Sequence, residues 1–258
     1  MKGRPRRAYA QARVQARFGS RPGREFWRRL ATSRDLTHYL QVARTGPVSG
    51  WVEGMSAEED THSFELKLRQ AWGHAVRELA GWQETTWWRA VDWLWVLPYL
   101  GPAQHLCDGR PAPAWMFMDP VASRLIGTEG LLLDQASIKG PLARLVERRE
   151  PGSGVIDAWA ARWHALWPET DARTRHGLAK LEAGVRLHVD SLAHAAPDVG
   201  SRALRQAVER LFARLFRRYS TTAVAAFAYL GLVALDLEHL RWGLVRRRAF
   251  PSLDQVTA

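Results

Sequence analysis

Apolar residues recur three and four positions apart along most of this chain, which is the spacing of amphipathic helices. The clearest example is the stretch 222–248, whose apolar side chains fall on one face (Phe227, Leu230, Val233, Ala234, Leu237, Leu240 and Leu244). Its apolar run before Asp236 is about fifteen residues, whereas a bilayer-spanning helix needs about 20. Three arginines at 246–248 suit the negative C-terminal end of a helix, and Pro251 stops it. The pattern predicts a long helix buried within protein.

The same spacing predicts helices elsewhere. Ser33 is expected to cap a helix that has Asp35 in its first turn, and the segment Ser56–Glu59 reads as a capping box that opens the next helix. Long helices are also expected from about residue 171 and from Ser201. No stretch alternates cleanly between apolar and polar residues, as a half-buried strand would. We therefore expect an all-α, multi-helix bundle.

Prolines and glycines suggest how the bundle is divided. Prolines at 102, 111, 113 and 120 forbid a long helix there, and Pro151–Gly154 is the clearest internal boundary. We expect a single all-helical domain over 1–258, divisible into sub-bundles 1–100 and 152–258. A proline-rich connector with packed aromatic residues, 101–151, would join the two sub-bundles.

Composition leaves the partner open. The net charge of +11 comes almost wholly from arginine, which fits either a biased genome and solubility, or an acidic partner, a membrane surface or nucleic acid. The first 24 residues contain no acid, a composition typical of a transit peptide or a nucleic-acid-binding arm. The 13 tryptophans often have helical spacing, which favours core packing over an interfacial belt. A single cysteine excludes a disulfide framework and fits a reducing compartment.

Motifs for chemistry are weak. The sequence contains no P-loop, dinucleotide fingerprint, nucleophile elbow or zincin helix. Cys107 and His105 lie in a proline-rich segment that gives a thiolate–imidazole pair little support. A metal site built on His188, Asp190 and His194 is disfavoured, because the first two side chains diverge on a helix. We predict no catalytic residue, no cofactor and no metal.

Three phrases carry a family resemblance. Near the start, Tyr9, Gln11, Ala12, Arg13 and Val14 precede a loop at 19–23 and the aromatic pair Phe26–Trp27. The segment 33–45 then reads SRDLTHYLQVART, and the segment 235–241 reads LDLEHLR, with an acidic pair before an aliphatic residue and an arginine. Together they resemble the central-stalk connector subunit of V-type ATPases, called C in prokaryotes and d in eukaryotes. His239 stands where that family often has asparagine, and the chain is shorter than the usual member.

The resemblance covers roughly the first 45 and the last 30 residues best, and it implies a role. Such subunits are all-helical, built of related helical bundles around a funnel. They are not enzymes. They sit peripherally at the cytoplasmic face of the membrane and couple the central shaft of an ion-translocating, often proton-translocating, rotary ATPase to its membrane rotor ring. The matching residues Tyr9, Arg13, Asp236, Glu238 and Arg241 would then serve interaction with partner subunits, and Glu238 and Arg241 are spaced to pair with each other.

Two other classes remain open. The basic N-terminal segment and the arginine excess favour a helical nucleic-acid-binding protein, although basic residues are spread over nearly all predicted helices. A tryptophan-lined pocket in a helical bundle would favour an enzyme, but it would need a convergent polar cluster that the sequence does not show.

Overall fold

The computed structural model describes residues 3–147, 154–194 and 201–250, with side chains described over 5–147, 154–187 and 203–250. Helices account for all of its regular structure; within the described ranges the only β-pairing is an isolated antiparallel bridge between Ile126 and Leu132. The helices pack in the manner of a bundle. The predicted all-α class is confirmed.

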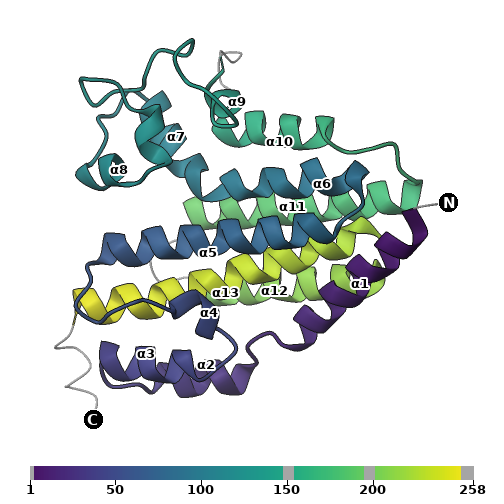
Figure 1. Ribbon diagram of the computed structural model, residues 1–258, viewed down its shortest axis with the longest axis horizontal. Coiled ribbons are helices and arrows are strands. Elements are labelled where there is room, and N and C mark those ends of the chain that lie inside the picture. Colours follow the sequence, from purple (N-terminus) through teal and green to yellow (C-terminus); the bar gives the residue numbers. More distant parts are fainter. Residues whose placement is uncertain (1–2, 148–153, 195–200, 251–258) are drawn as a thin grey trace. The chain divides into compact units, whose positions relative to one another are not determined.

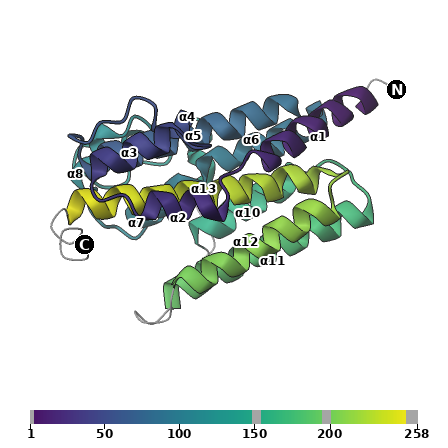
Figure 2. The same cartoon turned by 90° about the horizontal axis from the view of Figure 1, so that it is seen from below.

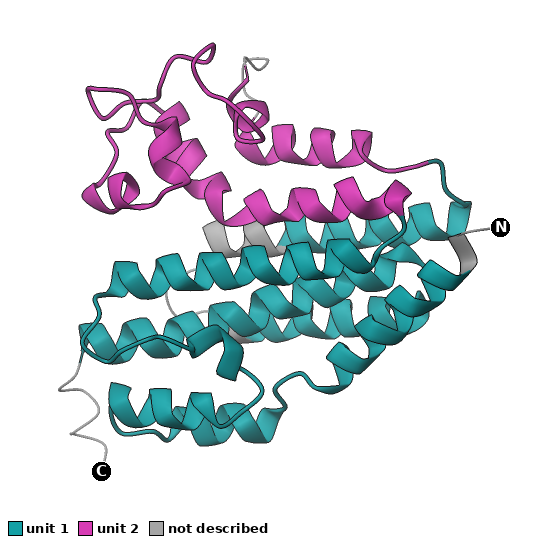
Figure 3. Cartoon of the chain, in the orientation of Figure 1, with its two compact units in different colours: residues 1–84, 169–258 teal, residues 85–168 magenta. Residues whose placement is uncertain are grey.

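The chain forms two compact units, shown in Figure 3. Unit 1 comprises residues 1–84 and 169–258 and unit 2 comprises residues 85–168. The helices of unit 1 are α1 (Gly3–Gly19), α2 (Arg24–Ala31), α3 (Leu36–Arg44), α4 (Ser49–Val52), α5 (Thr61–Trp82), α11 (Ala172–His194), α12 (Ser201–Arg218) and α13 (Ala223–Ala249). Those of unit 2 are α6 (Thr85–Asp92), the 3-10 helix η1 (Trp93–Tyr99), α7 (Leu100–Cys107), α8 (Ala114–Met118), the 3-10 helix η2 (Ala122–Leu125), α9 (Ala143–Val146) and α10 (Val155–Ala165).

These boundaries differ from the expected sub-bundles 1–100 and 152–258. The described part of the proline-rich connector packs inside unit 2, where α7 contacts η1, α9 and α10. Prolines that forbid one long helix still allow short helices and turns: Pro98 lies inside η1, and α7 spans Pro102 near its start. Unit 2 is thus an insertion between α5 and α11, and unit 1 is built from both sides of it.

Helix α13 is the centre of unit 1. It contacts α1, α3, α5, α11 and α12, as Figures 1 and 2 show from two directions. Residues Val224 to Ala228 are all buried, so its first half is covered around the whole circumference and not only on one face. By length and apolarity α13 also meets the criteria for a membrane-spanning helix, but 67% of its apolar window is buried inside the protein. A core helix passes the same test.

Local chemistry fixes where α13 begins and ends. The Thr222 hydroxyl accepts from the backbone N–H of Val224, which satisfies an otherwise unpaired donor of the first turn. Close neighbours require small residues along the helix: a Cβ on Gly231 would lie 2.6 Å from Phe212 of α12. One on Gly243 would collide with the phenol oxygen of Tyr39. The predicted helix over 222–248 is confirmed to within a residue at each end.

Two predicted caps are wrong. Helix α3 is capped by Asp35, which accepts from the backbone N–H of His38, whereas Ser33 is buried before it. Helix α5 is capped by Asp60, which accepts from the N–H of Ser63 at 2.7 Å. A carboxylate stands closer to each helix start than the predicted cap, and Asp and Asn cap at least as well as Ser.

Charge and tryptophan are divided unevenly between the units. Unit 2 has eight Lys or Arg and eight Asp or Glu residues, so the whole net charge of +11 belongs to unit 1. Eight of the 13 tryptophans belong to unit 2, which is less than half the length of unit 1. The two composition signals therefore concern different parts of the molecule.

Candidate functional site

The predicted interaction residues of α1 lie on an exposed surface of unit 1. Tyr9 is 53% exposed. The Arg13 guanidinium lies 4.8 Å from the ring centroid of Trp82 at the end of α5 and 5.9 Å from that of Tyr9. Arg17, one turn further on, pairs with Glu78 at 2.6 Å. Tyr9 and Arg13 are exposed, whereas the Trp82 ring next to Arg13 is buried. Tyrosine and arginine are among the residues that contribute most to binding energy at protein interfaces, and we call Tyr9 and Arg13, with Trp82 behind the guanidinium, the α1 surface.

Asp236 has a different environment from the one expected of an interface residue. It is only 4% exposed and forms two hydrogen bonds with Arg21, which lies between α1 and α2: Nε to Oδ2 at 2.8 Å and Nη2 to Oδ1 at 2.9 Å. Glu209 of α12 lies 3.8 Å from the same guanidinium, at half-exposed depth. Burial raises the pKa of Asp236 to about 6 in spite of Arg21, and the charge of Glu209 adds to the rise. The pair joins segments 215 residues apart.

Glu238 and Arg241 pair with other helices and not with each other. Glu238 accepts from Arg205 of α12 at 3.1 Å, and Arg241 donates two hydrogen bonds to Glu65 of α5, at 2.5 and 3.1 Å. Asp236 and Glu238 contact different neighbours, because residues two apart on a helix do not share a face. The charged residues in the second half of α13 therefore form ion pairs with three other segments of unit 1: Arg21, helix α12 and helix α5.

Sequence reasoning missed Arg247. This side chain is only 8% exposed; its guanidinium donates to the carbonyl oxygens of Ala31 and Ser33 and lies 4.4 Å from the ring centroid of Tyr39. The Tyr39 hydroxyl reaches the carbonyl of Leu240 at 3.5 Å, and burial raises its pKa far above the ordinary value, so the phenol stays protonated. A signal was available, because Leu237, Leu240 and Leu244 continue at the same spacing to position 247.

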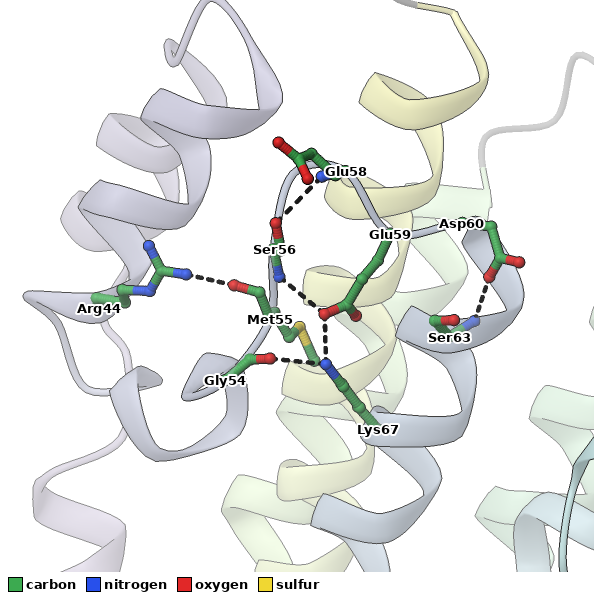
Figure 4. Close-up of polar contacts among 9 residues, drawn as sticks. All are labelled: Arg44, Gly54, Met55, Ser56, Glu58, Glu59, Asp60, Ser63 and Lys67. Atoms are coloured by element: carbon green, nitrogen blue, oxygen red, sulfur yellow. Dashed lines mark hydrogen bonds and ion pairs between the residues drawn. The ribbon is translucent and has the colours of Figure 1, made fainter.

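A turn before α5 forms a second polar cluster, drawn in Figure 4. The Lys67 ammonium donates to the Gly54 carbonyl at 2.7 Å and pairs with Glu59 at 2.5 Å, and the same carboxylate accepts from the N–H of Ser56 at 3.0 Å. Arg44 of α3 donates to the Met55 carbonyl. Gly54 has a positive φ of 72° that favours glycine. These contacts satisfy backbone hydrogen-bonding groups of a tight turn. We therefore infer that the cluster holds the loop in shape and is not a functional site.

The candidates for chemistry in unit 2 are arranged as structural groups. The His105 ring contacts the Pro111 carbonyl at 2.9 Å. Trp159 and Trp163 stack with ring centroids 5.5 Å apart, and Trp93 donates its indole N–H to the Trp159 carbonyl. Trp159 and Trp163 are 4% and 1% exposed, which agrees with the core role predicted for the helical tryptophans.

The remaining metal hypothesis lies outside the described side chains. The side chains of His188, Asp190 and His194 are not described. Earlier in the same helix, Arg186 pairs with Glu182 at 3.0 Å. Among the residues that are described, no group of three His, Cys, Asp or Glu side chains has an arrangement that could hold a metal.

No family model, curated protein or solved structure matches this chain.

Proposed function

We propose that the chain is a non-catalytic connector subunit of a V-type rotary ATPase, peripheral to the cytoplasmic face of the membrane, coupling the central shaft to the rotor ring. The funnel of related bundles that the family resemblance implies belongs to the same proposal. The function needs an interaction surface and a rigid body, and neither requires a cofactor or a reaction.

One observation carries the proposal. The three phrases that resemble the family come from opposite ends of the chain, yet they belong to one packed unit: α13 contacts both α1 and α3. Arg21 reaches Asp236 across 215 residues, and Tyr39 packs where Gly243 leaves room for its ring. A resemblance due to chance would have no reason to concentrate in segments that contact each other.

The structure changes which residues we assign to interaction. Asp236 is buried and paired, so it holds the unit together. Tyr9, Arg13 and Arg241 are exposed and remain the residues proposed to meet partner subunits. Glu238, with a 36% exposed side chain, lies three residues before Arg241. The α1 surface combines an exposed tyrosine with a cation held over a tryptophan, which suits protein–protein contact.

The test is gentle purification of the tagged chain from native membranes. Shaft and rotor-ring subunits of a rotary ATPase should be recovered with it. The Arg241→Ala variant should melt within a few degrees of the unchanged protein, because a half-exposed pair contributes about 0–1 kcal/mol. We expect its recovery with the rotor to fall, and ATP hydrolysis to continue while ion transport fails.

Arg28→Ala is the matched control, since it breaks an exposed ion pair of the same unit, with Glu25, outside the matched phrases. It should leave both recovery and coupling unchanged. If Arg241→Ala unfolds the protein, the arginine is structural and its interface role is wrong. If no rotary ATPase subunit is recovered with the unchanged chain, the connector proposal fails.

Nucleic-acid binding is the second candidate, because the entire excess charge lies on unit 1. We expect only weak, sequence-blind binding to duplex that weakens steeply as salt rises, as counterion release requires. Tight and sequence-selective binding at physiological salt would put this candidate first.

A further inference from the structure

Three arginines from three helices converge on the turn between α12 and α13. Arg7 of α1 donates to the carbonyl of Thr221 at 2.5 Å, and Arg173 of α11 donates to that of Arg218 at 2.9 Å. The guanidinium groups of Arg173 and Arg218 lie 5.8 and 6.0 Å from the ring centroid of Tyr219. Figures 1 and 2 show the starts of α1 and α11 and this turn at one end of unit 1. We call Arg7, Arg173 and Arg218 the arginine end.

The charges of the arginine end are not neutralised by neighbouring carboxylates. Within the described part of the chain, no carboxylate lies within ion-pair distance of these three exposed side chains. The nearest acid in sequence, Asp171, uses its two oxygens to accept from the N–H and hydroxyl of Thr174 and so caps α11. Carbonyls and an aromatic ring hold guanidinium groups in place but leave their full positive charge.

Other arginines of unit 1 show the contrast. Arg17, Arg205 and Arg241 each pair with a glutamate from another helix. At the arginine end no described glutamate plays that part, and the guanidinium groups of Arg7 and Arg173 donate to backbone carbonyls instead. The contacts of Arg7 and Arg173 each use one of five N–H donors, which leaves the guanidinium fork able to bind a carboxylate through two bonds.

We propose that the arginine end binds a short acidic segment of a protein partner, with glutamate or aspartate carboxylates seated on Arg7, Arg173 and Arg218. The site is compact, being gathered on one four-residue turn, whereas duplex binding draws on a row of phosphate contacts along the groove or backbone. The basic residues along α1 do not offer an uninterrupted row of free charges, because Arg17 is paired with Glu78. This inference goes beyond the connector proposal and stands whether or not the partner is an ATPase subunit.

The test is fluorescence anisotropy with a fluorescein-labelled oligoglutamate peptide at low and at physiological salt. The triple variant Arg7→Gln, Arg173→Gln and Arg218→Gln should weaken binding about tenfold or more, as loss of two or three charge-assisted contacts predicts. The matched control changes Arg24, Arg34 and Arg210 to glutamine; all three are exposed arginines of unit 1, so the net charge falls equally. The control triple should stay within about twofold of the unchanged protein.

Arg218 provides a milder variant, since none of its described contacts is a side-chain hydrogen bond; Arg218→Glu should fold as judged by circular dichroism and still weaken binding. Equal losses in the two triples would show that the peptide responds only to net charge and would overturn the proposal. So would an unchanged affinity in Arg218→Glu, or no binding by the unchanged protein. If an oligonucleotide binds more tightly than the peptide and competes for the same three arginines, nucleic acid is the occupant and the proposal is wrong.

Discussion

Replacing Arg21 with alanine should lower the free energy of unfolding of unit 1 far more than replacing any exposed arginine does. The side chain of Arg21 is 13% exposed and that of Asp236 is 5% exposed, and the two share two hydrogen bonds of 2.8 and 2.9 Å. Without Arg21, a carboxylate stays buried with neither its counter-charge nor those donors. Removing one partner of a buried pair costs about 3–5 kcal/mol, and we expect a loss of that size at neutral pH.

The assay is urea unfolding followed by far-ultraviolet circular dichroism, with hydrogen exchange of α13 to assign the transition to unit 1. Arg34→Ala is the control, because this exposed arginine should change the free energy of unfolding by no more than about 0.5 kcal/mol. The double variant Arg21→Met with Asp236→Leu removes both charges, and a well-packed apolar replacement of a buried pair is often neutral or stabilising. It should recover much of the stability that the single variant loses.

Two results would refute this reasoning. A loss below about 1 kcal/mol in Arg21→Ala would mean that water or another residue reaches the Asp236 carboxylate and replaces the arginine. A double variant less stable than the single variant would mean that Asp236 stabilises unit 1 through contacts other than the ion pair.

Two further predictions follow from the same unit. The pKa of Asp236 in the folded protein is about 6, above the ordinary value of 3.8, so the folded state binds more protons than the unfolded state between these pH values. As the pH falls from 7 to below 4, the free energy of unfolding of the unchanged protein should therefore rise by about 3 kcal/mol relative to that of Asp236→Asn. Urea unfolding of both proteins across this pH range measures the difference. A constant difference would contradict that assignment. Gly243→Ala should lower the melting temperature, because the added Cβ would collide with Tyr39 at a cost of about 1–3 kcal/mol. Gly81→Ala is the control: its Cβ meets open space, and the variant should gain up to about 1 kcal/mol from helix propensity. Equal effects of the two substitutions on the melting temperature would show that Tyr39 moves aside without cost.

Much of unit 1 could be predicted because its helices follow local rules. The three-and-four spacing and the C-terminal arginines placed α13 almost to the residue, and the absence of alternation predicted an all-α chain. The caps went wrong where two candidates competed within a few residues: Asp35 stands two residues after Ser33, and Asp60 stands four residues after Ser56. Spacing alone does not decide such a competition, because it depends on which backbone N–H groups are left unpaired.

Partners far apart in sequence were beyond these rules. No local sequence pattern links Arg21 with Asp236. The i,i+3 spacing allows Glu238 to pair with Arg241. In the structure Glu238 instead pairs with Arg205 of α12, and Arg241 pairs with Glu65 of α5. The boundaries of the two units differ from the expected sub-bundles for a similar reason. Prolines mark where helices break, whereas compact units are decided by which broken pieces pack together, and α6 to α10 pack with the proline-rich stretch between them.

The insertion of unit 2 also dictates an order of events during synthesis. Helix α5 needs α13 as a packing partner, but about 140 residues separate the end of one from the start of the other. At about 5–20 residues per second, the ribosome makes α13 on the order of ten seconds after α5. Unit 2 is contiguous in sequence, so it can fold in that interval. During the same interval the apolar faces with which α1, α3 and α5 contact α13 have no packing partner. We therefore expect nascent chains stalled before α13 to bind chaperones through their first 84 residues.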